Sequence, residues 1–108
     1  MTNKLYSLDN KLIEETDSAI PDNFTGIIEY FEGTKQWFVD GKQHRIDGPA
    51  IEYYNGTKHW YVDGKPHRLN GPAFENSDGS KYWCVDGKQV TELQCNLLCD
   101  MMKLKGML

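Results

Sequence analysis

Apolar and polar residues alternate along the middle of the chain, in short runs separated by pairs of turn-forming residues. Between Ile51 and Val62, β-branched and aromatic residues lie on both sides of Asn55-Gly56, and Asp63-Gly64 follows at once. A period of two is typical of β-strands, and Asn-Gly and Asp-Gly tolerate the positive φ angles of type I′ turns. Each pair is therefore expected to close a two-residue hairpin. The pattern predicts a mainly β protein, an antiparallel β-meander.

This unit recurs every 23 residues. The markers that repeat are a tryptophan, an Asp-Gly pair, a His-Arg pair and a Gly-Pro-Ala group. They occur at Trp37, Trp60 and Trp83, at Asp40, Asp63 and Asp86, at His44-Arg45 and His67-Arg68, and at Gly48-Pro49-Ala50 and Gly71-Pro72-Ala73. A period of about 20 to 50 residues indicates a repeat architecture, in which one supersecondary unit stacks on the next.

Two-residue turns also predict which side chains face one another across the strands. One row is expected to bury the tryptophans and form the spine of the fold, in the order Ile51, Trp60 and His67. A second row is expected on the opposite face, in the order Glu52, His59 and Arg68. Repeat proteins individualise their surface where matched positions vary. The expected partner-binding residues are therefore Phe38, Glu52, His59, Tyr61, Arg68 and Tyr82.

The two ends of the chain depart from the repeat, so three regions are expected: a lead-in over 1–22, the β-repeat array over 23–90 and a C-terminal capping helix over 91–108. A hairpin around Asp9-Asn10 is favoured over a short helix in the lead-in. Thr91 and Gln94 predict a capping box. The helix is expected to be amphipathic and to cover the last sheet edge or the tryptophan face with a stripe of Leu93, Leu97, Met101, Leu104 and Leu108. Leu98 and Met102 lie at the margin of this stripe and form a secondary candidate interface.

Composition excludes several functional classes. The net charge is −4, and the chain has no cluster of basic residues, so neither nucleic acid nor an anionic membrane is an expected partner. The sequence has no apolar run of membrane-spanning length and no signal-peptide core. Three cysteines give no disulfide framework. We expect a cytoplasmic protein with reduced thiols.

No arrangement of residues predicts catalysis, and no cofactor, metal or catalytic residue is expected. Cys95 and Cys99 are four residues apart, but no second pair completes a zinc site, so they and Cys84 are interpreted as packing thiols. The pairs His44-Arg45 and His67-Arg68 suggest phosphate binding. Because they recur with the repeat, we favour a structural role, with bonds to turn carbonyls and to neighbouring glutamates (Glu29 and Glu52) that fix the Gly-Pro corner.

The repeat resembles MORN-type repeats, whose unit also has 23 residues. The matching elements are an aromatic strand, an (N/D)GK turn, a following histidine and a D-G turn, here Trp60-Tyr61-Val62-Asp63-Gly64-Lys65, His67 and Asp78-Gly79. The resemblance covers about Thr25 to Val90. HRIDGPA and HRLNGPA depart from the common pattern and resemble a variant in small proteins of bacteriophages and large DNA viruses, and more distantly antitoxin-like proteins of bacteria. The resemblance implies a binding scaffold and no catalytic residues.

Together these observations predict a non-enzymatic protein-interaction module. The resemblance implies a phage accessory protein that acts in the bacterial cytoplasm, where it binds and inhibits a host or defence protein. The alternatives are a protein that sequesters a small ligand such as a nucleotide, an antitoxin-like protein or a membrane-surface binder. A homodimer is left open, because a symmetric pocket built from two His-Arg rows would need one.

Overall fold

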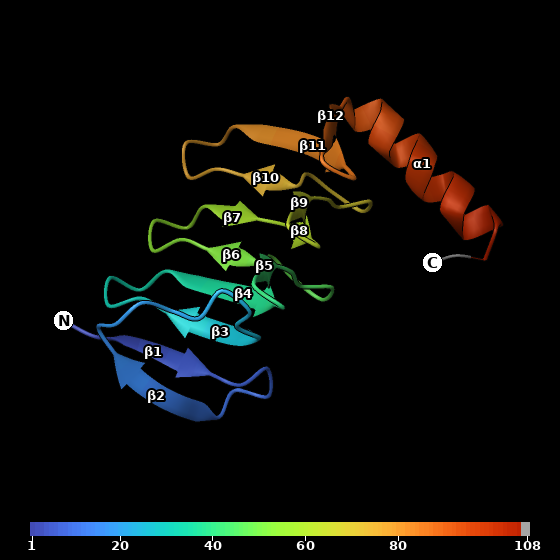
Figure 1. Cartoon of the computed structure of the whole chain (residues 1–108). Coiled ribbons are helices and arrows are strands. Elements are labelled where there is room, and N and C mark those ends of the chain that lie inside the picture. The colour runs from blue at the N-terminus through green and yellow to red at the C-terminus, as the bar shows by residue number, and fades with distance from the viewer. Residues whose placement is uncertain (107–108) are drawn as a thin grey trace.

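A computed structural model describes residues 1–106, and within them the chain forms a meander of short β-hairpins that ends in one helix (Figure 1). The elements, in chain order, are β1 (Asn3–Tyr6), β2 (Leu12–Thr16), β3 (Gly26–Glu29), β4 (Lys35–Val39), β5 (Lys42–Gln43), β6 (Ile51–Glu52), β7 (Lys58–His59), β8 (Tyr61–Val62), β9 (Lys65–Pro66), β10 (Phe74–Glu75), β11 (Lys81–Val85), β12 (Lys88–Val90) and α1 (Glu92–Leu104). The expected mainly β, antiparallel meander with a C-terminal helix is confirmed.

Nearly all of the strands join one antiparallel sheet in the order β12-β11-β10-β7-β6-β4-β3-β1-β2, with β5 paired to β4. Strands β8 and β9 pair only with each other. Each repeat contributes two hairpins. The second one is separate from the main sheet in the middle unit, whereas in the first and third units it shares the long strand β4 or β11 with the sheet. The second hairpins stack along the right-hand side of the molecule in Figure 1.

The two hairpins of a repeat use different turns, which corrects one prediction. At Asp63-Gly64 both φ angles are positive, and Val62 lies opposite Lys65, as expected for a type I′ turn. At Asn55-Gly56 only the glycine has a positive φ, and Tyr53 donates its N–H to Thr57 O. The loop therefore holds three residues and ends in a glycine bulge. The two-residue turn expected here was wrong.

One extra loop residue moves the strand pairing by one position, so the predicted rows were wrong as well. Ile51 lies opposite His59 instead of Trp60, and Glu52 lies opposite Lys58 instead of His59. Because side chains alternate between the two faces, a one-residue shift exchanges the partners of both faces. The isoleucine and the tryptophan of a unit therefore lie on opposite faces, and no Ile-Trp-His spine exists. The three tryptophans still share one face, as expected.

The second hairpins hold successive repeats together through backbone hydrogen bonds. The turn glycine of each one donates its N–H to a carbonyl of the preceding unit, Gly64 to Gln43 O and Gly87 to Pro66 O, both at 2.9 Å. The first turn has no complete repeat before it, and Gly41 donates to Phe24 O instead. A Cβ on Gly41 would lie 1.7 Å from Asp22 O, so no other residue fits this contact.

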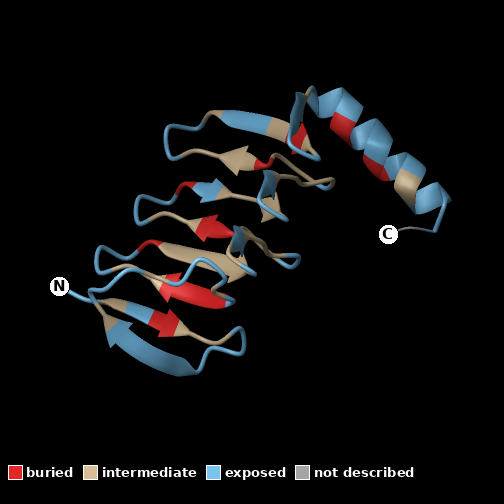
Figure 2. Cartoon of the chain, in the orientation of Figure 1, coloured by how far each residue is buried: buried red, intermediate tan, exposed pale blue. Residues whose placement is uncertain are grey.

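Buried residues follow the centre of the main sheet, on both of its faces (Figure 2). Leu5, Ile28 and Ile51 are buried on one face, and Ala50 and Ala73 are fully buried on the other. The lead-in forms the expected hairpin from β1 and β2, with Asn10 in the left-handed region (φ 68°). Strand β2 is almost entirely exposed and forms the outer edge.

Helix α1 begins with the predicted capping box, in which Thr91 and Gln94 each bond to the other's backbone N–H. Its packing differs from the prediction. The buried residues are Cys95 and Cys99, and the Cys95 thiol contacts Arg68 O at 3.3 Å. At about 100° per residue, the predicted stripe lies on the opposite side of the helix and is exposed, at Leu93, Leu97, Met101 and Leu104. Leu108 lies outside the described residues.

The stripe was expected to pack inward because it is the most apolar side of the helix. Small thiols allow the helix to approach the 68–71 backbone closely, and that approach decides which side is buried. Between residues 1 and 106, no helix has both the length and the apolar character needed to cross a bilayer.

Candidate interaction surface

The two faces of the main sheet differ in chemistry, and we name them by their residues. The tryptophan face carries Trp37, Trp60 and Trp83 together with a row of alternating charges. The charges lie opposite one another across successive strands, in the order Glu15, Lys4, Glu29, Lys35, Glu52, Lys58, Glu75 and Lys81. Cross-strand pairs of opposite charge each contribute about 0.2–1 kcal/mol. Each pair therefore adds a small preference for the observed register between β2 and β11.

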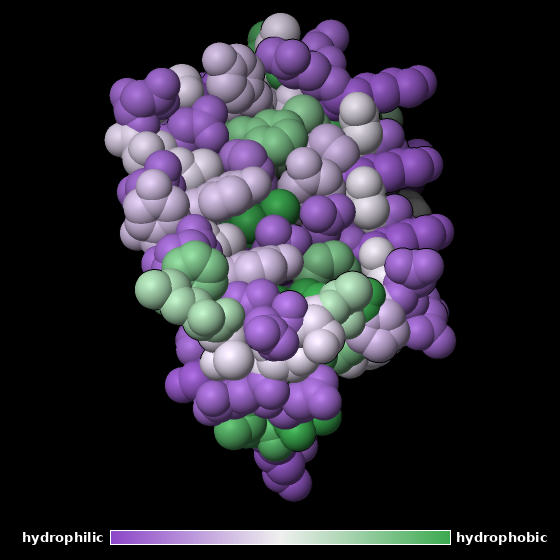
Figure 3. All heavy atoms as spheres, turned by 60° about the vertical axis from the view of Figure 1, so that its left-hand side comes forward, coloured by the Kyte–Doolittle hydropathy of each residue, from purple (hydrophilic) through white to green (hydrophobic). Residues whose placement is uncertain are grey.

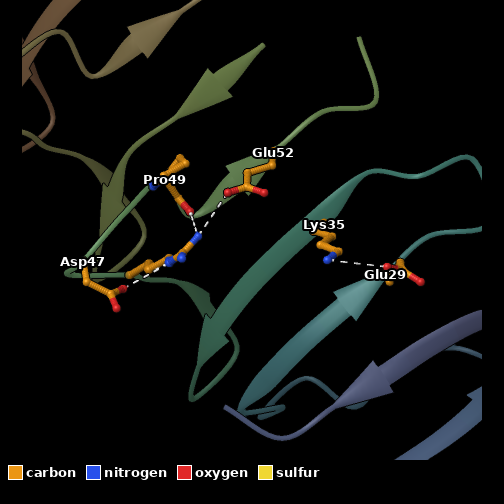
Figure 4. A network of polar contacts seen from close by, with 6 residues as sticks. Glu29, Lys35, Asp47, Pro49 and Glu52 are labelled. Carbon is orange, nitrogen blue, oxygen red and sulfur yellow. Dashed lines mark hydrogen bonds and ion pairs between the residues drawn. The ribbon is translucent and has the colours of Figure 1, made fainter. Parts of the chain in front are cut away.

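The arginines of the tryptophan face are committed to the protein's own groups. The Arg45 guanidinium stacks on Trp37, 3.9 Å from the ring centroid. It also donates to Asp47 and Pro49 O, both at 3.1 Å, and to Glu52 at 3.2 Å (Figure 4). Arg68 repeats this arrangement on Trp60, at 3.8 Å, with Asn70, Pro72 O and Glu75.

This arrangement also explains the Gly-Pro-Ala group. A Cβ on Gly48 would lie 2.8 Å from the Arg45 guanidinium carbon, and Gly71 is placed in the same way against Arg68. The arginines thus fix the Gly-Pro corner, as predicted. Their glutamate partners, however, lie on the following unit, at Glu52 and Glu75, where Glu29 and Glu52 were expected.

The histidines of the His-Arg pairs join neighbouring units. His44 Nδ1 accepts the N–H of Asp63 at 3.1 Å, and His67 Nδ1 accepts the N–H of Asp86 at 3.0 Å. The Asp63 carboxylate lies 3.4 Å from the same His44 nitrogen. Because that nitrogen accepts the backbone N–H, it carries no proton for the carboxylate, and this approach is not an ion pair. The histidine bonds are therefore structural, although they go to turn N–H groups and not to turn carbonyls.

The open face is the other side of the sheet, and its centre is an aromatic cluster of half-exposed rings. His59 lies edge-on to Phe74 (4.6 Å between ring centroids) and to Tyr53 (5.1 Å). Tyr61 packs against Phe74 at 6.2 Å, and Tyr82 lies opposite Phe74 in the register. Figure 3 shows a surface of this kind, with green apolar and pale side chains along the middle and purple hydrophilic side chains at the margins.

A shallow hollow of about 380 Å³ lies in the open face. Its lining combines aromatic, amide and thiol side chains, namely those of His59, Phe74, Asn76, Tyr82, Cys84 and Gln89. His59 Nε2 lies 3.3 Å from the Asn76 amide oxygen. Desolvation lowers the pKa of His59, although the bond to Asn76 opposes this effect. Desolvation, reinforced by Tyr53 and Cys84, raises the pKa of Tyr61. Both shifts favour the neutral form of the side chain.

The structure brings together four of the six predicted partner-binding residues. Phe38, His59, Tyr61 and Tyr82 share the open face. Glu52 lies on the tryptophan face because the register of the first hairpin is shifted by one residue. Arg68 lies there because it follows the end of β9 and its guanidinium stacks on Trp60. The secondary candidates lie beside the docked side of α1, with Leu98 at 36% exposure and Met102 half-buried.

Three residues of the open face were not among the predicted residues, namely Tyr53, Phe74 and Asn76. The sequence contains a signal for them, because each differs from a residue at the matched position of a neighbouring repeat. Tyr53 is matched by Asn76, and Phe74 is matched by Ile51. The prediction considered such variation only in the shifted row. These three residues can be assigned to the open face only once the pairing of the strands is known.

The surroundings of the cysteines disfavour the reactive thiolate. Cys84, Cys95 and Cys99 are all buried, and desolvation raises the pKa of Cys84 and Cys95, which disfavours the reactive thiolate. Among residues 1–106, no group of three or more His, Cys, Asp or Glu side chains is arranged to hold a metal ion. The thiols therefore act here as small packing groups.

A second hollow, of about 330 Å³, lies on the tryptophan face near Leu8, Trp37, His44 and Arg45. Its cationic group is Arg45, which is already bonded to three acceptors of the protein. Two of these acceptors are the carboxylates of Asp47 and Glu52, which compensate the charge of Arg45 and would repel a phosphate bound here. The open face is therefore the better candidate site.

Comparison of the chain with protein families, with curated proteins and with solved structures gives no match.

Proposed function

We propose that the protein is a non-enzymatic interaction module that binds another protein through its open face. The observation that carries the proposal is the half-exposed cluster of Tyr53, His59, Tyr61, Phe74 and Tyr82. Tyrosine and other aromatic side chains are enriched in the energetically important centres of protein interfaces. The cluster is also the part of the repeat whose side chains vary from unit to unit, which is where a repeat protein adapts to a partner.

The resemblance to the MORN variant supports a particular kind of partner. HRIDGPA and HRLNGPA resemble segments of small phage proteins, so we propose a host or defence protein of a bacterium as the target, with inhibition as the outcome. Nucleotide sequestration is the weaker proposal, because both arginines that would bind a phosphate are held by the protein's own acceptors.

Site-specific photo-crosslinking tests the proposal. A benzophenone amino acid replaces Tyr61 on the open face or Lys58 on the tryptophan face, and each protein is irradiated in a bacterial lysate. We expect Tyr61 to give a discrete adduct with one protein, which Lys58 does not give. The additional change Tyr82→Ala should reduce the adduct about tenfold or more, as for an interface hot spot. Equal labelling from both positions, or no adduct that depends on Tyr82, would overturn the proposal.

A further inference from the structure

Strand β11 differs from its counterparts in having one half without a neighbour. In the first two units, the start of the strand pairs with the following unit at two positions. Gln36 lies opposite Ile51 and Lys35 opposite Glu52, and in the next unit His59 lies opposite Phe74 and Lys58 opposite Glu75. In both units the strand begins with a lysine that lies opposite a glutamate, and the residue after the lysine lies opposite an apolar residue.

Two further contacts complete the docking of each incoming strand. The backbone N–H of the tryptophan donates to the carbonyl of the residue before the apolar one. These bonds run from Trp37 to Ala50 O and from Trp60 to Ala73 O, both at 2.8 Å. A threonine hydroxyl accepts the N–H of the second residue after the glutamate. These bonds run from Tyr54 to Thr34 Oγ1 at 3.2 Å and from Ser77 to Thr57 Oγ1 at 2.9 Å.

The third unit repeats these positions, but only Trp83 is paired on the outer side, with Val90 of β12, and the described part of the chain places no strand beside the rest. Ser80, Lys81, Tyr82 and Trp83 occupy the positions of Thr57, Lys58, His59 and Trp60. The segment that would pair with them, counted by the same spacing, is residues 96–100, which belong to α1. Strand β12 pairs only with Trp83, Cys84 and Val85. Within residues 1–106, the outer edge at Lys81 and Tyr82 therefore has no strand beside it.

This half of the edge is accessible. Lys81 and Tyr82 are both exposed. Helix α1 continues from β12, at the other end of β11, and runs away from the 81–82 segment (Figure 1). Lys81 is also the last charge of the alternating row, with a glutamate on its inner side and none on its outer side.

We propose that the 80–82 edge, at the start of β11, binds an extended segment of a partner protein by β-strand addition. The segment runs antiparallel to β11, with an apolar residue opposite Tyr82 and, next to it, a glutamate opposite Lys81. The N–H two residues after the glutamate donates to Ser80 Oγ. Apart from the bond to the tryptophan N–H, which Trp83 uses for β12, this is the pattern that the protein uses for its own strands. The occupant is therefore a peptide of the type small-apolar-Glu.

The geometry of Ser80 supports this assignment. Its hydroxyl donates to Asp78 Oδ1 at 2.6 Å, as the Thr34 hydroxyl donates to Glu32 Oε2 at 3.0 Å. In both cases the carboxylate orients the hydroxyl oxygen so that a lone pair can accept from an incoming strand. Ser80 also accepts from the Asn76 amide at 3.0 Å, which leaves it one further acceptor position.

The protein's own sequence supplies the probe. The peptide GPAFENSD, identical to residues 71–78, is titrated into the ¹⁵N-labelled protein and compared with GPAFKNSD, in which lysine replaces the glutamate. We expect amide shifts confined to residues 80–83 with the first peptide, and about two- to fivefold weaker binding of the second, the range of one cross-strand charge pair. In the variant Lys81→Glu this preference should invert. Lys88→Glu is the matched control, because it makes the same change in charge on β12, and it should leave the preference intact.

Three outcomes of the titration would overturn the inference. They are the absence of shifts at residues 80–83 at millimolar peptide, shifts centred on β2 or on the open face, and a peptide preference that Lys81→Glu does not change. Self-association through β2 of a second copy would appear as a sedimentation coefficient that rises with concentration in the absence of peptide, and this too would contradict a foreign peptide as the occupant. Because the crosslinking experiment reports from Tyr61, failure of the open-face proposal would be seen separately.

Discussion

The tryptophan face and the open face are built by the same strands and obey opposite rules. On the tryptophan face, each arginine has a ring to stack on and three acceptors, and successive units copy the arrangement. On the open face, matched positions change from Gln36 to His59 to Tyr82, and many of the rings are half-exposed. The first face is occupied by its own interactions, whereas the second offers side chains that the fold does not need. Repetition thus marks what stabilises the fold, and variation marks what is free to bind.

The largest expected effect is the loss of an indole from the tryptophan face. Trp60→Ala removes the ring beneath Arg68 and leaves a cavity beside buried Ala73, so we expect the free energy of unfolding to fall by about 3 kcal/mol. Urea denaturation measures the change. Trp60→Phe keeps a ring under the guanidinium and should lose less than half as much. A loss below about 1 kcal/mol for the alanine variant would contradict the distinction between the faces.

Removal of the arginine should cost less. In Arg68→Ala the carbonyl of Pro72 loses its donor and the Trp60 ring loses its cation, and we expect a loss of about 2 kcal/mol. Arg68→Lys keeps the charge but not the planar fork, so it should recover only part of this loss. The same urea titration distinguishes the two variants. Full recovery with lysine would show that charge alone matters at this position.

On the open face, a change of similar size should have little effect on stability. Tyr82 is 44% exposed, and Tyr82→Ala should lower the free energy of unfolding by about 0.5 kcal/mol. A thermal melt compared with that of Trp60→Ala gives the ratio directly. If Tyr82→Ala destabilises the protein as much as Trp60→Ala does, the open face is part of the core and its exposed rings are not available for binding.

The smallest expected effect is a dependence on pH. Desolvation lowers the pKa of His59 in the folded protein below its ordinary value of 6.5. The unfolded chain therefore binds more protons as the pH falls, and the stabilising contribution of neutral His59 is present above pH 6.5 and is lost as the pH drops toward the folded pKa. Urea midpoints measured between pH 7.5 and 5 should fall more steeply for the natural protein than for His59→Gln. Parallel profiles would show that His59 is solvated like an exposed histidine.

The sequence was sufficient for the architecture and insufficient for the face assignment, and the reason lies in one turn. The Asp63-Gly64 prediction was correct because Asp and Gly both adopt positive φ in a type I′ turn. Asn55-Gly56 suits that turn equally well, but the chain adopts a three-residue loop in which only Gly56 has a positive φ. Thr57 favours the longer loop, because its N–H donates to the Asn55 side chain and its hydroxyl oxygen accepts the N–H of Ser77 in the next unit. Those long-range contacts cannot be read from local turn preferences.

The helix shows the same limit. Its start at Thr91 and its amphipathic character follow from local sequence, and both were predicted. Which side it buries depends on the surface that it meets, which is the 68–71 backbone, where only small side chains such as Cys95 fit. For this reason the leucine stripe, the most apolar side, remains in solvent.

The backbone hydrogen bonds of the turn glycines join the second hairpin of each unit only to the preceding unit. For the first unit, the 22–24 segment takes the place of a preceding unit. These contacts do not depend on the number of units that follow. The array therefore has a fixed starting point and an adjustable length, so that duplication of residues 48–70 would lengthen the molecule by one module while every existing neighbour keeps its place. Gain or loss of whole modules offers such a protein a route to a longer or shorter contact surface without redesign of its interior.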